Sequence, residues 1–243
     1  MKENKPVLHT VLTPSLLPLY NASDTIVVII DVLRATSTIA TALYNGAKYI
    51  IPVDSVAKCI ELGQMPDTVT AGERDGRVAE GLQHGNSPLE YTRDFIENKI
   101  LALTTTNGTH LLSLALNQDA GTIITGSFPN LSAVVNYLTE QNRDVLLACA
   151  AWKGRINLED TLFAGAIVNA LQNRFEINCD ASRMAQMLYG EAGGNLFEFL
   201  RTREASHYRR LSGYGLEEDI RYCLSVDVAS ILPVYREGKL IAE

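Results

Sequence analysis

Runs of consecutive apolar residues alternate along the chain with segments in which apolar residues recur at helical spacing. The apolar runs predict strands, because a strand that is covered on both faces needs no polar alternation. We expect these strands at residues 25–30, 49–53, 67–71, 100–104, 122–125 and 145–150. The segments between them predict helices at residues 37–44, 56–63, 109–117, 131–141 and 160–172. Strands that alternate with helices predict an α/β fold with a largely parallel sheet.

The last third of the chain has a different pattern. Helical spacing covers residues 181–190, 196–210 and 217–224, and residues 231–241 predict a final hairpin or edge strand. No linker rich in Ser, Pro or Gly separates this part from the rest. We therefore predict a single α/β domain over residues 1–243, with a mixed, largely parallel sheet and a helical C-terminal third.

Composition and charge exclude several classes of protein. The 243 residues include 21 Lys and Arg against 28 Asp and Glu, a formal net charge of −7, which argues against nucleic acid or an anionic membrane as a partner. No apolar run reaches about 18 residues, so no membrane span is expected. The four cysteines form no C-x-x-C pair and the N-terminal segment has no signal-peptide core, so we predict a cytoplasmic location.

Polar residues gather where the predicted strands end, which is where open α/β sheets bind ligands. Asp31 and Arg34 follow the first apolar run and can face a shared crevice, although a capping acid beside a solvated Arg would give the same pattern. Residues 104–109 (T-T-T-N-G-T) end another strand and open a helix. Their hydroxyls and the helix N–H groups suit an anion, and an ordinary strand-to-helix turn is the alternative.

Three further turns carry candidate residues. Glu73 lies in a charged turn at 72–77, a pattern that more often marks a solvated loop. Ser87, followed by Pro88 and Glu90, predicts a capping box. Glu159 and Asp160 lie in the first turn of a predicted helix, where acids often only complement the helix dipole. These two side chains point roughly 100° apart, so we expect one of them to face a given site.

Together these segments resemble the 2-phosphosulfolactate phosphatase family from about residue 24 to residue 236. The matching segments are residues 31–36, 72–74, 85–88, 105–109, 159–161, 164–165 and 215–220, with Cys223. Two positions depart from the family pattern, Asp75 and the pair Gln83-His84. The resemblance implies a three-layer α/β/α fold and a magnesium-dependent phosphatase. Such an enzyme hydrolyses 2-phospho-3-sulfolactate to 3-sulfolactate and phosphate, a step of coenzyme M biosynthesis.

The chemistry of a phosphomonoester assigns roles to these residues. Mg²⁺ neutralises the phosphate charge and takes one or two carboxylates, so we expect Asp31 and one or both of Glu159 and Asp160 to hold it. Glu73 would orient or deprotonate the attacking water. We expect the catalytic residues to be Asp31, Arg34 and Glu73. The expected substrate contacts are Arg34, Asn86, Ser87, Thr105, Thr106, Asn107, Gly108 and Thr109, with Arg77, Lys153 and Arg155 in reserve for a second anionic group.

Several alternatives stay open at this point. Asp31 could act as a covalent nucleophile, but haloacid-dehalogenase-like phosphatases carry a second Asp two residues later, where this chain has Leu33. Direct attack by water is therefore the preferred mechanism. A non-catalytic protein that binds a small anion would use the same loops. Another magnesium-dependent phosphotransferase is disfavoured, because the Walker and G-x-G-x-x-G patterns are absent. The physiological substrate and the role of His207 are not fixed by the sequence, which is also compatible with a homodimer.

Overall fold

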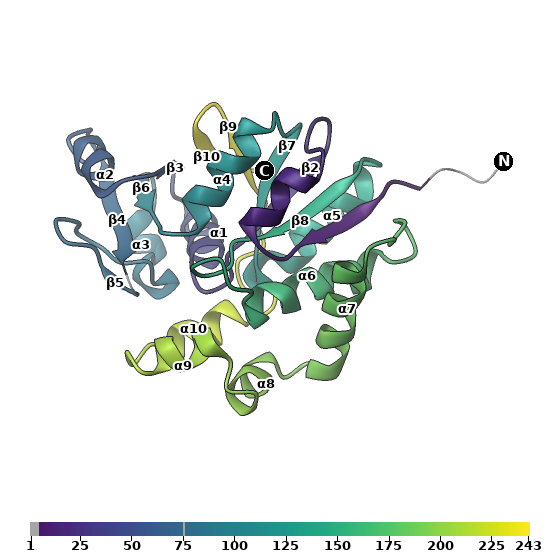
Figure 1. Cartoon of the computed structure of the whole chain (residues 1–243). Helices are drawn as coiled ribbons and strands as arrows, with labels where there is room; N and C mark the ends of the chain where they lie inside the picture. Colours follow the sequence, from purple (N-terminus) through teal and green to yellow (C-terminus); the bar gives the residue numbers. More distant parts are fainter. Residues whose placement is uncertain (1–4, 75) are drawn as a thin grey trace.

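The computed structural model describes residues 5–74 and 76–243, so Asp75 lies outside the described residues (Figure 1). In this part of the chain ten strands form one sheet, in the order β1-β8-β2-β7-β9-β10-β3-β6-β4-β5. The strands are β1 Leu8–Val11, β2 Ile26–Ile30, β3 Tyr49–Val53, β4 Thr68–Arg74, β5 Arg77–Val78, β6 Ile100–Thr104, β7 Thr122–Gly126, β8 Val145–Cys149, β9 Pro233–Arg236 and β10 Lys239–Ala242. The predicted mixed, largely parallel α/β sheet is confirmed.

The helices lie between the strands as the pattern predicts, and five of them follow one another near the C-terminus. The α-helices are α1 Ala35–Tyr44, α2 Val56–Leu62, α3 Arg93–Ile96, α4 Gly108–Asn117, α5 Leu131–Glu140, α6 Leu158–Leu171, α7 Asp180–Ala192, α8 Leu196–Thr202, α9 Ser206–Ser212 and α10 Glu217–Cys223. Short 3-10 turns are η1 Pro14–Leu19, η2 Pro88–Glu90 and η3 Phe128–Asn130. The helical C-terminal part is therefore confirmed, with β9 and β10 after it.

Two parallel blocks make up the sheet. Strands β1, β8, β2 and β7 form one block, and β3, β6 and β4 form the other. The hairpin β9–β10 pairs antiparallel with β7 on one side and with β3 on the other. Three antiparallel pairings thus separate the blocks, which run in opposite directions. Of the two alternatives predicted for residues 231–241, the hairpin is confirmed, and it lies inside the sheet, where Val234 and Leu240 are buried.

Helices cover both faces of each block, which confirms the three layers. Helices α5 to α10 bury their apolar residues in one hydrophobic cluster with one face of the first block, and α4 and η1 cover the other face. Helices α1 and α3 cover one face of the second block, and α2 covers the other. Figure 1 shows α6 to α10 gathered on one side of the sheet, in green and yellow.

The remaining differences from the predicted elements have local causes. The expected helix at 196–210 is two helices, α8 and α9, because Glu204 adopts a left-handed conformation with φ of 49° that a helix cannot continue through. Strand β1 was not predicted, because it has only four residues and follows a polar segment. These residues form a strand by pairing with β8. Within the described residues no helix is both long and apolar enough to span a membrane. The single-domain organisation stays a prediction, which the shared hairpin favours.

Candidate active site

A cleft that is open to solvent lies where the loops after β2, β4, β6 and β8 meet α9. Both parallel blocks contribute to it: a Cβ atom placed on Gly108, after β6, would lie 3.4 Å from Asp31 Oδ2, after β2. In a flat sheet these two ends would lie on opposite edges. A twist of about 20–25° at each strand pair turns one block against the other across the hairpin. The cleft is lined by Asp31, Leu33, Arg34, Glu73, Gly76, Asn86, Thr106, Asn107, Trp152, Lys153, His207, Arg210 and Leu211.

Asp31 ends the buried strand β2 and is itself only 8% exposed. The pKa of its carboxyl group is raised to about 6, mainly by burial and also by the nearby carboxylates of Glu73 and Glu159. His207 and a hydrogen bond from the Ala35 N–H act in the opposite direction and lower this pKa. The surroundings of Asp31 therefore disfavour its ionised form, and acids perturbed in this way are common at functional sites.

Arg34 is buried beside the cleft and its guanidinium is fixed from two sides. It forms an ion pair with Asp219 of α10 and donates a hydrogen bond of 3.2 Å to the Gly76 carbonyl. The other Asp219 oxygen accepts a 2.9 Å hydrogen bond from Ser87 Oγ. Sequence reasoning did not select Asp219, since three acids open α10 and only packing shows which of them points inward. It lies within the segment 215–220 that carries the family resemblance.

Glu73 holds two loops together at the rim of the cleft. One carboxylate oxygen accepts hydrogen bonds from the N–H and the Oγ1 of Thr106, at 3.2 and 3.1 Å. The other accepts the Gly76 N–H at 2.9 Å. Both oxygens are thus used by the protein, which makes Glu73 a weaker candidate for a general base than the sequence suggested.

The hydroxyl-rich segment after β6 divides between two cavities. Thr106 and Asn107 line the cleft. Thr105, Gly108 and Thr109 instead line a small, mainly apolar cavity between α1 and α4, where the Thr105 hydroxyl has no hydrogen-bond partner. Of the side chains of this segment, those of Thr106 and Asn107 are therefore the ones placed to contact a ligand in the cleft.

The predicted capping box at the start of η2 is wrong. The Ser87 hydroxyl donates to Asp219, and the Glu90 carboxylate accepts the N–H of Gly85 at 3.2 Å instead of the N–H of Ser87. Because Asp219 also holds Arg34, Ser87 acts on the site through that carboxylate. Asn86 lines the cleft, and its buried Oδ1 has no hydrogen-bond partner.

Glu159 and Asp160 are fully buried at the start of α6 and do not line the cleft directly. Asp160 Oδ1 accepts the Val32 N–H at 2.9 Å, which ties α6 to the loop after β2. Burial, together with Glu159 and Asp31, raises the pKa of Asp160 well above its usual range. The second oxygens of the two side chains, Glu159 Oε2 and Asp160 Oδ2, have no hydrogen-bond partner.

His207 and Arg210 bring α9 into the cleft, which the sequence alone did not predict. His207 is 6% exposed and its Nδ1 lies 2.5 Å from Glu159 Oε1. Arg210 contacts His207 Nε2 and stacks on the ring of Trp152, which Lys153 also approaches. Of the reserve cations, Lys153 lines the cleft, whereas Arg77 stacks on Tyr214 outside it and Arg155 is exposed.

Comparison with known proteins places the chain in a family. A family model described as 2-phosphosulpholactate phosphatase matches residues 11–238. The chain belongs to the 2-phosphosulfolactate phosphatase family. Two similar proteins, each named "Probable 2-phosphosulfolactate phosphatase", come from Caldanaerobacter subterraneus and Thermotoga maritima. The first is 40% identical over 216 residues (87% of this chain and 88% of the relative), and the second 42% identical over 214 residues (88% and 90%).

The carboxylates of this family member fit a magnesium ion in their chemistry. Within residues 5–74 and 76–243 no three His, Cys, Asp or Glu side chains converge as a ready metal site. Mg²⁺ needs only one or two carboxylates, however, and completes its shell with water and substrate oxygens. The buried, unpartnered oxygens of Glu159 and Asp160 are costly when ionised. Carboxylate oxygens such as these and those of Asp31 are the type of donor that Mg²⁺ prefers.

Proposed function

We propose that this protein is a magnesium-dependent phosphatase for 2-phospho-3-sulfolactate or a similar small phosphorylated acid, and that it releases phosphate and the free hydroxy acid. The observation that carries the proposal is the fixed guanidinium of Arg34 beside the buried carboxyl of Asp31 in one cleft. An Arg whose orientation is set by Asp219 and Gly76 suits the planar recognition of a phosphoryl group. The names of the relatives support the same substrate.

The phosphoryl group would lie between Arg34 and the segment that opens α4. The Thr106 and Asn107 positions face the cleft, and the helix end offers N–H groups to an anion. Asp31, with Glu159 or Asp160, would hold Mg²⁺, which supplies charge neutralisation at the phosphate. Glu73 would keep Thr106 and Gly76 in place rather than deprotonate water.

We propose direct attack by water rather than a covalent intermediate. A water oxygen bonds to phosphorus, its proton passes to the Asp31 carboxylate, and the bond from phosphorus to the hydroxy-acid oxygen breaks. The proton held by Asp31 then reaches the departing oxygen. The Asp31 oxygen that does not hold Mg²⁺ would accept and return this proton.

Phosphate release from 2-phospho-3-sulfolactate, measured with Mg²⁺ and with EDTA, tests this function. We expect turnover with Mg²⁺ that EDTA removes and that added Mg²⁺ restores. Tight sulfolactate binding without metal-dependent release would instead indicate the non-catalytic anion-binding protein. A phosphoaspartate trapped on Asp31 would contradict direct water attack, and nucleotide binding in a titration would favour a phosphotransferase. The place in coenzyme M biosynthesis, the cytoplasmic location and the homodimer stay predictions from the sequence.

A further inference from the structure

Arg210 is a cation of the cleft whose charge the described protein does not neutralise. It lines the cleft from α9, and within residues 5–74 and 76–243 it forms no ion pair with a carboxylate. Its Nε atom is buried and has no hydrogen-bond partner. We propose that Arg210 binds an oxyanion of the substrate, and that Glu159 and His207 position it for this task. The inference deepens the proposed function and rests on it for the identity of the substrate.

The contrast with Arg34 supports this assignment. Arg34 is paired with Asp219, so its charge is already compensated inside the protein and its main contribution is geometry. Arg210 donates to a histidine nitrogen instead. Since an arginine only donates hydrogen bonds, His207 Nε2 is the acceptor in this contact, and Nδ1 faces Glu159. A histidine nitrogen carries no formal negative charge, so this contact orients Arg210 without cancelling its charge as a carboxylate would.

The positioning chain is buried along most of its length. Glu159 is 0% exposed and His207 is 6% exposed. Each link is a side-chain contact of 2.5 Å, from Glu159 Oε1 to His207 Nδ1 and from His207 Nε2 to the Arg210 guanidinium. The chain connects α6 to α9 and ends at the cleft. The buried Nε of Arg210, at the end of this chain, is unfavourable without an acceptor.

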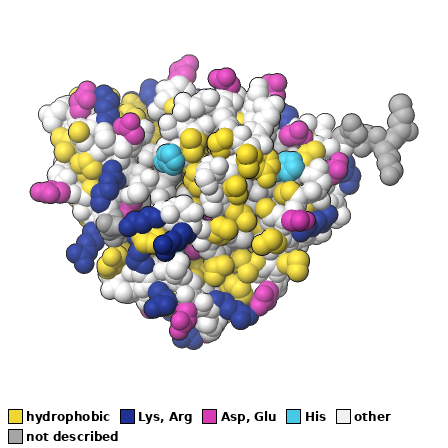
Figure 2. Space-filling view, in the orientation of Figure 1, with side chains coloured by type: hydrophobic (Ala, Val, Ile, Leu, Met, Phe, Trp, Pro, Cys, Tyr) yellow, Lys and Arg dark blue, Asp and Glu magenta, His cyan; other side chains and the backbone are white. Residues whose placement is uncertain are grey.

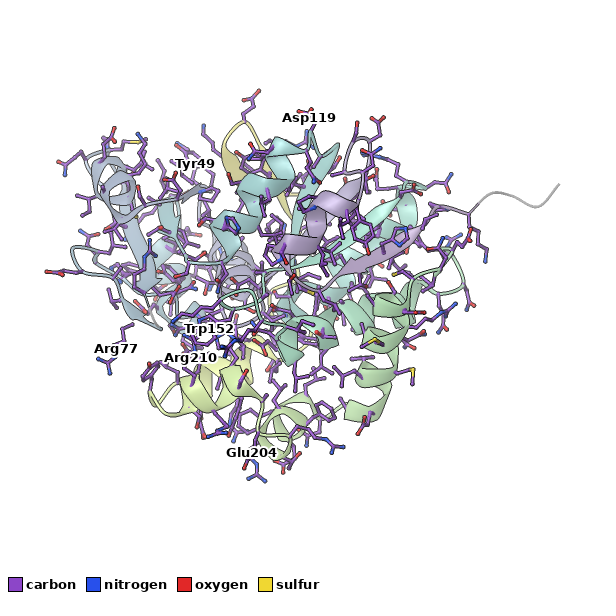
Figure 3. All side chains as sticks on the ribbon, viewed as in Figure 1. Tyr49, Arg77, Asp119, Trp152, Glu204 and Arg210 are labelled. Carbon is purple, nitrogen blue, oxygen red and sulfur yellow. The ribbon has the colours of Figure 1, made fainter. Side chains whose placement is uncertain are left out.

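An aromatic ring supports the other side of the guanidinium. The central carbon of Arg210 lies 4.4 Å from the centre of the Trp152 ring, in the loop after β8 (Figure 3). Lys153 Nζ lies 4.6 Å from the same ring centre. Figure 2 shows Lys and Arg side chains gathered around a small hydrophobic patch at the place where Figure 3 labels Trp152 and Arg210. This local positive surface suits an oxyanion although the whole chain is acidic.

Binding of inorganic phosphate to metal-free protein tests the proposal without any turnover. Trp152 is the one tryptophan of the chain, so its fluorescence reports directly on the ring beneath Arg210. We expect saturable phosphate binding to the wild type and a dissociation constant about 10-fold higher in Arg210→Gln, because a charge-assisted hydrogen bond is lost. Calorimetry should give the same constants, which excludes an effect of the variant on fluorescence alone.

A neighbouring arginine provides the matched control. Arg209 is exposed, on the same helix, and paired only with Glu204 at 3.7 Å. Arg209→Gln removes the same charge and should bind phosphate like the wild type. Equal affinity in Arg210→Gln and Arg209→Gln, or no saturable binding to the wild type, would overturn the proposal. If binding behaves as expected and no phosphatase activity is found, the proposed function fails while this inference stands.

Two substrates then show which oxyanion Arg210 binds. p-Nitrophenyl phosphate has only its phosphoryl group, whereas 2-phospho-3-sulfolactate also has acid groups. A KM that rises about 10-fold for both substrates in Arg210→Gln assigns the phosphoryl group, and a rise for the sulfolactate alone assigns an acid group. No rise for either substrate contradicts the proposal.

The positioning role of His207 has its own test. His207→Leu removes the acceptor for Arg210 and should weaken phosphate binding several-fold, whereas His207→Gln keeps an acceptor oxygen and should restore part of the affinity. Both variants should be compared only where thermal unfolding shows a folded protein. Wild-type phosphate affinity in folded His207→Leu would show that Arg210 does not depend on this chain.

Discussion

Two groups of carboxylates lie in or behind the wall of the cleft, and they differ in how their oxygens are hydrogen-bonded. The rim carboxylates, Glu73 and Asp219, use both of their oxygens in hydrogen bonds or an ion pair to the loops and to Arg34. The floor carboxylates, Asp31, Glu159 and Asp160, are buried close to one another, and two of their oxygens have no partner. The rim carboxylates therefore fix the positions of the loops and of Arg34. The unfavourable burial of negative charge is concentrated in the floor carboxylates.

This difference separates carboxylates that stabilise the fold from carboxylates that are candidates for the chemistry. A carboxylate whose oxygens are all hydrogen-bonded stabilises the fold, and removing it leaves its partners unsatisfied. A carboxylate buried against its neighbours destabilises the ligand-free fold, and removing it relieves that cost. Substitutions at rim and floor should consequently change stability in opposite directions.

The largest effect is expected from the rim, in Asp219→Asn. This substitution leaves the buried Arg34 guanidinium without its counter-charge, which costs about 3–5 kcal/mol when a buried ion pair loses one partner. Urea denaturation measures the loss. Glu218→Gln is the control, because Glu218 is the exposed neighbour on the same helix turn. A stable Asp219→Asn protein with the denaturation midpoint of the wild type would show that the rim pair does not hold the site.

The floor is tested by Asp31→Asn, which should gain stability and lose activity. The pKa of this carboxyl lies at about 6 in the folded protein and at an ordinary 3.8 when unfolded. The folded state therefore binds the proton more tightly, and wild-type stability falls as the pH rises from about 4 to about 6. Asparagine removes this penalty, which amounts to at most about 3 kcal/mol above pH 7. The catalytic rate should fall at least about 10²-fold.

Unfolding of the metal-free proteins at pH 4 and pH 8 checks this sign. The stability difference between Asp31→Asn and wild type should be present at pH 8 and nearly absent at pH 4. Asp54→Asn, at an exposed position after β3, controls for the general loss of one negative charge. A destabilised Asp31→Asn at pH 8, or near wild-type turnover in the folded variant, would remove Asp31 from the floor group.

Mg²⁺ should stabilise the wild type through the floor carboxylates. A ligand that binds only the folded state at 100 times its dissociation constant adds about 2.7 kcal/mol. We expect the melting temperature to rise with Mg²⁺ in the wild type and to rise much less in Asp160→Asn, while Glu73→Gln keeps the response. An equal response in all three proteins would place the ion away from the floor.

The smallest effect is expected from Glu73→Gln. The amide still accepts from Thr106 through one oxygen but cannot accept the Gly76 N–H as well, so about one hydrogen bond, or roughly 1–2 kcal/mol, is lost. Activity should fall by about 10-fold or less. Glu80→Gln, an exposed acid nearby, is the control. A loss as large as that of Asp31→Asn would restore Glu73 as the general base.

Much of the cleft could be predicted because the ends of strands can be recognised in the sequence. Asp31, Arg34, Glu73, Asn86, Thr106 and Asn107 all come from such turns and do line one cleft. Asp219, His207 and Arg210 lie on helices, where several polar residues share each turn and tertiary packing decides which one points inward. Thr105, which precedes α4, faces the other cavity, because tertiary packing also decides which hydroxyl of this segment points into the cleft. The opposed directions of the two blocks depend on distant pairings that no local pattern encodes.

The position of the hairpin β9–β10 also has a consequence for the order in which the site is built. Asp31 and Thr106 belong to different parallel blocks, and the two blocks are joined in the sheet through residues 233–242. A growing polypeptide that has left the ribosome only as far as α10 still lacks the hairpin. Its two strand blocks would therefore be separate sheets with unpaired edges. Contacts of such long sequence separation form slowly and leave strand edges exposed in the meantime. We therefore expect the candidate cleft to be among the last features that form during synthesis.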